Sequence, residues 1–254
     1  MSPSEYLRSI LSREAVDASA GAPIRRDLAA TVEALCRQWA GRHLISVDTG
    51  GAFEKGMANR SGSAIDFVVA LSPDTPYTLA QIYESLHEAL WNAGHNSMRG
   101  EVGIGALING VPVDITPIRL PTRPGGAVEL YCRRLDASVF TDLNRHIELA
   151  IASGRAEEVR LIKLWRDQKG FDLPSFYLEL AVTAALKGEP RGQLAENVWH
   201  VLGFFEKSFL TRALVDPGNA TNIVSDLLRV SERQVIADQA AECRAGLPWS
   251  AIVY

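Results

Sequence analysis

The pattern of apolar and polar positions divides the first part of the chain into helices followed by strands. Apolar residues recur three and four positions apart over residues 4–19 and 24–40, and both stretches predict amphipathic helices. Gly41 is a suitable end for the second helix. Residues 43–48 alternate in polarity, and 65–71 is an apolar run that contains one aspartate, so both predict strands.

A helix and a hairpin are predicted next. Residues 79–94 carry helical periodicity. Two apolar runs, 104–108 and 111–118, flank the pair Asn109-Gly110, which favours a tight hairpin turn. The hairpin adds two strands to the sheet.

The remainder of the chain is predicted to be mainly helical. After a surface loop at 121–126, strand signals nearly cease, and helices are predicted over residues 156–168, 174–186, 194–207 and 231–245. A mixed sheet followed by a helical bundle predicts an α+β, two-lobed fold with the site in the cleft between the lobes. We place a core lobe at 1–135, whose N-terminal helices pack with the second lobe, and a helical lobe at 136–254.

A glycine-rich turn before the second strand is the first candidate for chemistry. Gly50, Gly51 and Gly56 permit positive φ angles and close approach by a phosphate, while Lys55 and Arg60 make the loop electropositive. The loop therefore suits a polyphosphate ligand.

Two aspartates on apolar strands are the second candidate. Side chains two positions apart on a strand share a face, so the Asp66 side chain is expected to point from the same face of the sheet as that of Ala64. Asp114 lies between Val113 and Ile115, and a carboxylate on such a strand is costly unless it is hydrogen-bonded or binds a metal.

The glycine turn and the aspartates together resemble the polymerase-β-like nucleotidyltransferases, which carry Gly-Ser, a basic loop and then Asp-x-Asp at the start of a strand. In this alignment Gly51 takes the glycine position, Ala52 the serine position, Ala64 the first metal-binding aspartate position and Asp66 the second. The third carboxylate of the family, in the pattern apolar-Asp-apolar-x-Pro, corresponds to Asp114. The resemblance implies Mg²⁺ or Mn²⁺ bound by the remaining aspartates.

Alanine at position 64 removes one expected carboxylate, and it has two possible origins. One is an engineered Asp→Ala substitution of the kind used to inactivate such an enzyme for crystallography, and the other is a natural pseudoenzyme. Ala52 removes a further phosphate donor, and its origin is open in the same way. The resemblance implies that this chain is slow or inert, while nucleotide binding survives.

Motifs in the second half narrow the resemblance to the cGAS/oligoadenylate-synthase branch, whose bacterial members are the CD-NTases. These motifs are Leu161-Ile162-Lys163-Leu164-Trp165, Pro174-Ser175-Phe176-Tyr177-Leu178-Glu179 and Asp216-Pro217-x-Asn219-x-x-Asn222. By this resemblance Lys163 and Ser175 hold the donor triphosphate, Phe176 stacks on a nucleobase, and Asn222 lies near the acceptor nucleotide.

Each of these residues also has an ordinary structural interpretation. Lys163 alone would be a solvated lysine paired with Glu158 or Asp167, and Phe176 would be a core residue. Ser175 beside Pro174 is also a suitable helix-start residue. The five histidines show no ligand spacing and are expected to be structural or exposed.

Composition limits the partners and the setting. The net charge of −4 argues against tight wrapping of a long nucleic acid. The beginning of the sequence is charged, and no run approaches the length of a membrane span, so we expect no membrane partner and a cytoplasmic location. Three widely spaced cysteines show no zinc spacing and are expected to be reduced core thiols: Cys36, Cys132 and Cys243.

Three functions remain open at this point. The resemblance implies a synthase that joins nucleoside triphosphates into a cyclic or linear oligonucleotide second messenger for bacterial antiphage signalling, with a regulatory or effector protein of the same operon as partner. An RNA terminal nucleotidyltransferase would share the core but should have a basic groove. A catalytically dead nucleotide sensor or scaffold would have both alanines as native residues.

Overall fold

The computed structural model describes residues 1–17, 23–123 and 125–254, and its sheet is organised around two parallel neighbours. These are β2 (Ile65–Leu71) and β5 (Val111–Arg119). The sheet runs in the order β1-β2-β5-β4-β3, and every other neighbouring pair in it is antiparallel, so the sheet is mixed. The other strands in this order are β1 (Leu44–Thr49), β4 (Ile104–Ile108) and β3 (Met98–Arg99).

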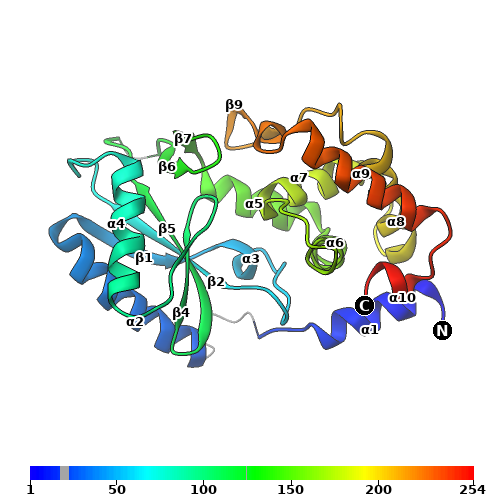
Figure 1. The fold of residues 1–254 in the computed structure, drawn as a ribbon, viewed down its shortest axis with the longest axis horizontal. Coiled ribbons are helices and arrows are strands. Elements are labelled where there is room, and N and C mark those ends of the chain that lie inside the picture. Colours follow the sequence, from blue (N-terminus) through cyan, green and yellow to red (C-terminus); the bar gives the residue numbers. More distant parts are fainter. Residues whose placement is uncertain (18–22, 124) are drawn as a thin grey trace.

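Helices α2 (Pro23–Ala40) and α4 (Leu79–Asn92) pack against the sheet. Buried residues of both helices form one hydrophobic cluster with β2, β4 and β5, including Val32, Leu86, Phe67 and Ile115. Figure 1 shows the sheet on the left with these helices at its outer side, and the remaining long helices on the right.

Strand alternation decides which side chains lie on which face of the sheet. Ile65, Phe67, Val113 and Ile115 are buried in the cluster with α2 and α4. Because successive side chains on a strand alternate between faces, the aspartates between them point to the opposite face, away from these helices. A register slip of one residue would bury the carboxylates and expose the apolar side chains.

The hairpin predicted around Asn109-Gly110 is confirmed. β4 and β5 pair antiparallel up to Ile108 and Val111. Asn109 and Gly110 have φ angles of +52° and +76°. Positive φ at both central residues is the geometry of a type I′ turn, which Asn-Gly adopts readily.

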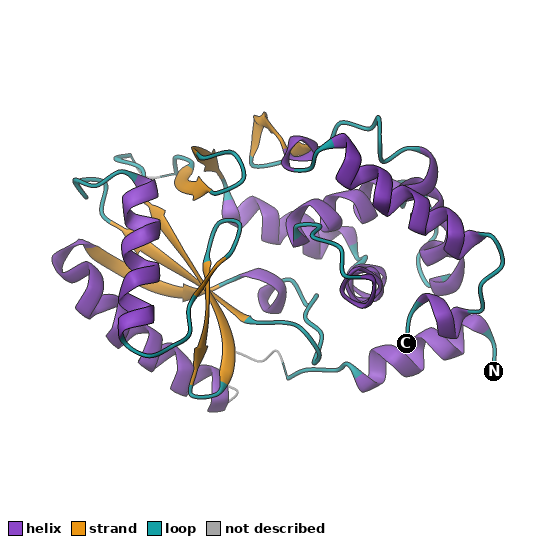
Figure 2. Ribbon diagram, in the orientation of Figure 1, coloured by secondary structure: helices purple, strands orange, loops and turns teal. Residues whose placement is uncertain are grey.

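A second hydrophobic cluster holds the helices of the C-terminal half together with α1 (Pro3–Arg13). Figure 2 shows this part of the molecule as almost entirely helical. Its helices are α5 (Leu143–Ser153), α6 (Ala156–Lys169), α7 (Ser175–Ala185), α8 (Leu194–Lys207), α9 (Val230–Arg244) and α10 (Trp249–Ile252). The described chain also contains the short helix α3 (Gly51–Glu54) and 3₁₀ turns at Gly41–His43 and Val224–Leu227.

The prediction that strands nearly cease after residue 126 is wrong. Strand β6 (Val128–Cys132) extends the sheet beyond β5, β7 (Ala137–Thr141) pairs with β6, and β8 (Val215–Asp216) pairs with β9 (Asn219–Ile223). These strands are short, and β7 and β9 are largely exposed, so their sequences lack the apolar runs that mark a buried strand. Pro124 of the preceding loop lies outside the described residues.

The two N-terminal helices lie in different clusters. We expected both to pack with the second lobe, but α2 packs against the sheet because Leu28, Val32 and Cys36 are buried there. Leu7, Ile10 and Leu11 of α1 lie in the helical cluster. Helix α1 ends at Arg13 rather than at residue 19, and residues 18–19 of the expected helix lie outside the described residues. The lobe boundary at 135 stays a prediction.

The fold class agrees with the sequence prediction, since a mixed sheet and a helical part are both present. The three cysteines are buried and free, as predicted. Within the described ranges, no helix combines the length and the apolar character needed to cross a membrane.

Met57 joins the two halves, because it follows α3 in the sequence yet is buried in the helical cluster, with 1% of its surface exposed. We expect Met57→Ala to lower the free energy of unfolding by about 2–5 kcal/mol, because a buried side chain is replaced by a cavity. Urea denaturation measures this change.

Met98→Ala is the matched control, because Met98 is 73% exposed. We expect this substitution to change the free energy of unfolding by less than ~0.5 kcal/mol. Equal losses for the two variants would contradict the assignment of Met57 to the core between the halves.

Candidate active site

The two aspartates singled out in the sequence are direct neighbours. Asp66 on β2 and Asp114 on β5 are register partners in the parallel pair. The backbone N–H of Ala52 donates to Asp66 Oδ2 at 3.0 Å. Gly51 has a φ of +61°, and a Cβ there would lie 1.9 Å from the same oxygen. Only glycine therefore allows the turn to approach Asp66 this closely.

Asp114 is held in a similar glycine-lined position. A Cβ on Gly103 would lie 2.0 Å from Asp114 Oδ1, and this buried oxygen has no hydrogen-bond partner within the part of the chain that the structure describes. Burial, together with the negative charge of Asp66, raises the pKa of Asp114 to about 7. Burial also raises the pKa of Asp66, against the hydrogen bond from Ala52 and the charges of Lys163 and Lys55.

This pair is chemically suited to a divalent cation. Two adjacent carboxylates, one with an oxygen that lacks a protein donor, are ligands of the type Mg²⁺ prefers, and Mg²⁺ commonly uses one or two carboxylates with water and substrate phosphates. Over the described residues, no group of three or more His, Cys, Asp or Glu side chains is placed to hold a metal. The two carboxylates therefore fit a divalent cation whose remaining ligands are water or other oxygens.

Ala64 lies directly before β2, two residues before Asp66, and its methyl side chain offers no oxygen. Ala52 provides its backbone N–H to Asp66 but has no hydroxyl for a phosphate. Ala52 therefore contacts the carboxylate pair through its backbone, and the correspondence of Ala52 and Ala64 to the serine and aspartate positions of the family stays a prediction.

Two lysines converge on one buried carboxylate. Lys55, which caps α3, and Lys163, on α6, each lie 2.8 Å from an oxygen of Glu179 on α7. Burial alone would raise the pKa of Glu179, but the charges and hydrogen bonds of Lys163 and Lys55 outweigh it, so the pKa is lowered. Lys163 is only 4% exposed, so the interpretation as a solvated lysine paired with Glu158 or Asp167 is wrong.

Phe176 lies beside this cluster and is stacked on a histidine. The ring centroids of Phe176 and His146 are 4.1 Å apart, with an angle of 25° between the planes. Lys55 Nζ lies 5.7 Å from the Phe176 centroid. Phe176 is half-buried and packs against the helical cluster, so it has a structural role there. Its predicted contact with a nucleobase stays a prediction.

The side chain of Ser175 is exposed and accepts a hydrogen bond of 2.9 Å from Arg166 Nη1. Ser175 is the first residue of α7 and makes no side-chain cap there, since Pro174 takes the N-cap position. Ser175 therefore starts the helix, as expected, but its side chain does not cap it.

Asn222 belongs to a polar cluster around Asp216. Its side-chain amide donates to Phe140 O at 2.8 Å and to Asp216 Oδ2 at 3.0 Å. Asp216 also contacts His146, the residue stacked on Phe176. The expected proximity of Asn222 to an acceptor nucleotide stays a prediction.

Three residues of this arrangement were not assigned a role from the sequence: Glu179, His146 and Asp216. Glu179 and Asp216 lie inside the motifs quoted for the resemblance, so the motifs include both residues but do not predict their contacts. His146 gave no signal, because Phe176 and Asp216, which its ring contacts, are far from it in the sequence.

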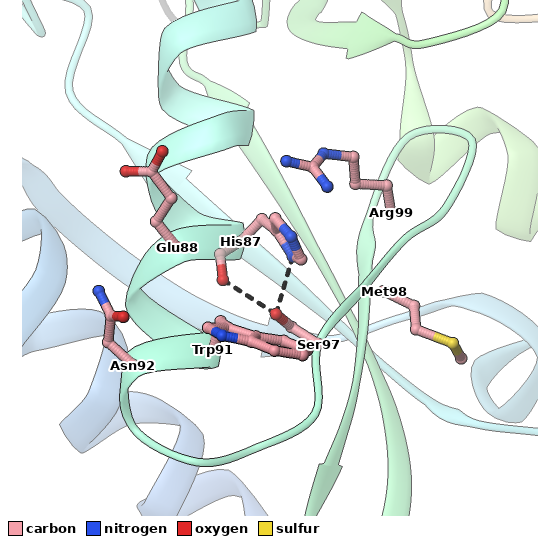
Figure 3. Close-up of a pocket in the computed structure, with 7 residues that line it drawn as sticks. All are labelled: His87, Glu88, Trp91, Asn92, Ser97, Met98 and Arg99. Carbon is pink, nitrogen blue, oxygen red and sulfur yellow. Dashed lines mark hydrogen bonds between the residues drawn. The ribbon is translucent and has the colours of Figure 1, made fainter.

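A separate surface pocket of about 510 Å³ lies between α4 and β3, and none of the predicted site residues lines it (Figure 3). The Ser97 hydroxyl lies there within hydrogen-bond distance of the ring and the backbone carbonyl of His87. The remaining lining residues are Glu88, Trp91, Asn92, Met98 and Arg99.

The sequence matches no protein-family model and no curated protein. Solved structures nevertheless share its fold. CdnC of E. coli MS115-1, solved in a complex with HORMA-deltaN, has a TM-score of 0.69 and 19% identity, over 94% of this chain and 88% of CdnC. The CdnE cyclic dinucleotide synthase of Elizabethkingia meningoseptica, solved with GTP and Apcpp, has a TM-score of 0.66 and 13% identity, over 96% and 99% of the two chains.

The same fold extends to an RNA-modifying enzyme. The Cid1 poly(U) polymerase, bound to MgATP, has a TM-score of 0.62 and 14% identity, over 94% of this chain and 92% of Cid1. The chain therefore has the polymerase-β-like nucleotidyltransferase fold of the CD-NTases, as the sequence motifs predicted.

Proposed function

We propose that this chain is a CD-NTase-like nucleotidyltransferase whose site joins nucleoside triphosphates into a cyclic or linear oligonucleotide second messenger in bacterial antiphage signalling. The observation that carries the proposal is the pair of in-register carboxylates, Asp66 and Asp114, next to the Gly51 turn. The positive charges of Lys163 and Lys55 act on Asp66. Carboxylates for a cation and ammonium groups for phosphate are the components that phosphoryl transfer requires.

The structural neighbours favour nucleoside triphosphates as substrates and a protein as a regulatory partner. CdnE was solved with GTP and an ATP analogue, and CdnC was solved both with ATP and with a HORMA protein. By analogy, this chain binds ATP or GTP and associates with a regulatory or effector protein encoded in the same operon.

Each of the predicted binding residues has a role in this proposal. Lys163 provides positive charge for the donor triphosphate. The Ser175 hydroxyl accepts from Arg166, so its own hydrogen can be donated to a phosphate oxygen. Phe176 provides an aromatic surface for a nucleobase, and Asn222 lies on the acceptor side.

The reaction is the attack of an acceptor 2′- or 3′-hydroxyl on the α-phosphate of the donor. A phosphorus–oxygen bond forms to the acceptor, the bond to the β-phosphate breaks, and pyrophosphate leaves. Bound Mg²⁺ or Mn²⁺ supplies Lewis-acid stabilisation of the phosphate charge. Asp114, beside Asp66 on the neighbouring strand, would help to activate the acceptor hydroxyl.

Two alternatives are each favoured by one observation. The similarity to Cid1 favours an RNA terminal nucleotidyltransferase, which would extend an RNA 3′ end. The alanines at positions 52 and 64 favour a nucleotide sensor or scaffold without turnover.

The activity test uses this chain and its Ala64→Asp variant with all four ribonucleoside triphosphates and Mg²⁺ or Mn²⁺. We expect Ala64→Asp to raise the rate of oligonucleotide formation on the order of a thousandfold, or about 4 kcal/mol of transition-state stabilisation, because it restores a metal-binding carboxylate. Mass spectrometry of the products measures this increase.

Ala64→Asn is the matched control, because it adds a side chain of the same size without the charge, and we expect no increase from it. Oligonucleotides of any linkage support the synthase. Extension of a labelled RNA primer instead supports the terminal transferase. If neither chain forms product while both bind nucleotide, the sensor replaces the synthase as the proposed function.

A second prediction concerns the pH dependence of folding. The pKa of Asp114 in the folded chain, about 7, lies above the ordinary aspartate value of 3.8. Its proton stabilises the fold below the unfolded pKa, and this contribution is lost as pH rises through 7. In the presence of a chelator, we expect Asp114→Asn to raise the free energy of unfolding by ~2–4 kcal/mol at about pH 8 and by much less at about pH 4.

Asp216→Asn should behave in the opposite way. Burial opposes ionisation of Asp216, but hydrogen bonds from His146, Thr141, Asn222 and the Gly218 N–H lower its pKa. Its ionised form stabilises the fold above the unfolded pKa, so this variant should be destabilised at about pH 8, with the loss shrinking as pH falls below about 4. Urea denaturation at a series of pH values tests both, and the same sign for the two variants would contradict the assignment.

A further inference from the structure

His146 covers one face of the ring that we propose receives a nucleobase. His146 is on α5 and Phe176 is on α7, and the two rings are stacked with their centroids 4.1 Å apart. His146 is 9% exposed, whereas Phe176 is only half-buried. The histidine is therefore the inner member of the stack, and it supports a ring that remains partly accessible.

Hydrogen bonds fix the plane of the His146 ring. Its Nε2 lies 2.6 Å from Asp216 Oδ1 and 3.0 Å from the Thr141 hydroxyl. Because Asp216 has a lowered pKa and is an ionised acceptor, the hydrogen of this contact belongs to Nε2. The imidazole is thus held in one orientation.

Asp216 is itself held by donors from several segments. Thr141 Oγ1 donates to its Oδ2 at 2.6 Å, Asn222 donates to the same oxygen at 3.0 Å, and the Gly218 N–H donates to Oδ1 at 2.7 Å. A Cβ on Gly218 would lie 2.6 Å from the backbone nitrogen of Asp142, so glycine allows the β8–β9 turn to reach this cluster. These hydrogen bonds around Asp216 therefore join the end of β7 to the β8–β9 hairpin.

The Phe176 ring lies close to the lysines that we propose bind the phosphates. Phe176 and Glu179 are three residues apart on α7 and so lie on one face of the helix. Lys55 forms an ion pair with Glu179 at 2.8 Å and lies 5.7 Å from the Phe176 centroid. The aromatic ring is therefore adjacent to the lysine cluster near Asp66.

We propose that His146 is a positioning residue for nucleobase binding. Its ring, held by the hydrogen bond to Asp216, fixes the plane of the Phe176 ring. This inference rests on the proposed function, because it assumes that Phe176 stacks on a base. A ring held in its bound orientation does not lose rotamer freedom when the base binds, whereas a ring without this support does. His146 should therefore affect the binding of the base and not the binding of the phosphates.

The experiment compares dissociation constants for ATP, GTP, CTP and UTP with that for inorganic tripolyphosphate, which has no base. We expect His146→Ala to weaken nucleotide binding about three- to tenfold and to leave tripolyphosphate binding unchanged. His146→Phe, which retains a stacking ring but loses the hydrogen bond to Asp216, should restore only part of the affinity. In the Phe176→Ala background, His146→Ala should cause no further loss of nucleotide affinity.

His200→Ala is the matched control, because His200 is a half-exposed histidine on α8 that pairs with Glu189. We expect His200→Ala to change neither the dissociation constants for the nucleotides nor that for tripolyphosphate. Thermal unfolding of each variant accompanies the titrations, and His146→Leu replaces His146→Ala if the alanine variant does not fold.

Equal weakening of nucleotide and tripolyphosphate binding by His146→Ala would overturn the proposal, because it would reveal a general structural effect. Unchanged nucleotide binding would overturn it as well. The proposed function fails separately, and the positioning role with it, if the unaltered chain binds tripolyphosphate and the nucleotides equally or binds neither.

Discussion

The ammonium groups of Lys55 and Lys163 both lie 2.8 Å from the buried carboxylate of Glu179, and the geometry of the site depends on this contact. Lys55 follows the glycine turn beside the sheet, while the other two residues belong to the helical part. Buried charges are tolerated when they are paired and hydrogen-bonded, and they are costly when a partner is missing. The three groups therefore hold α6 and α7 at a fixed position relative to the glycine turn.

The same contact determines the charge presented to a phosphate. Two lysines and one glutamate leave one net positive charge beside the carboxylate pair. The pKa of Asp114 is raised by burial and by the charge of Asp66, so the pair does not readily carry two negative charges when no cation is bound. Alanine at position 64 means one carboxylate fewer in this region. The site consequently repels a polyphosphate less than a site with three carboxylates would, although it offers fewer oxygens to a metal ion.

Local patterns were informative where a residue's role depends on its neighbours in the sequence. The Asn109-Gly110 hairpin follows from two residues that tolerate positive φ, and the common face of Asp66 and Asp114 follows from alternation on two strands with buried partners. Strands β6 and β7 were missed because they lie at the margin of the sheet, where one side of the strand is exposed and few apolar side chains are required. The location of α2 was missed because an amphipathic helix shows which face is buried but not what covers it.

By itself, the sequence determined the strands β1, β2, β4 and β5, most of the long helices, and the two aspartates on apolar strands, and its motifs predicted the nucleotidyltransferase fold. These depend on short-range periodicity and on motifs contained within single segments. Only the tertiary structure decided that Lys163 is buried against Glu179, that Ser175 accepts from Arg166 and that His146 supports Phe176. These contacts join side chains from different elements, and their partners are chosen by packing in three dimensions, which the periodicity of one segment does not encode.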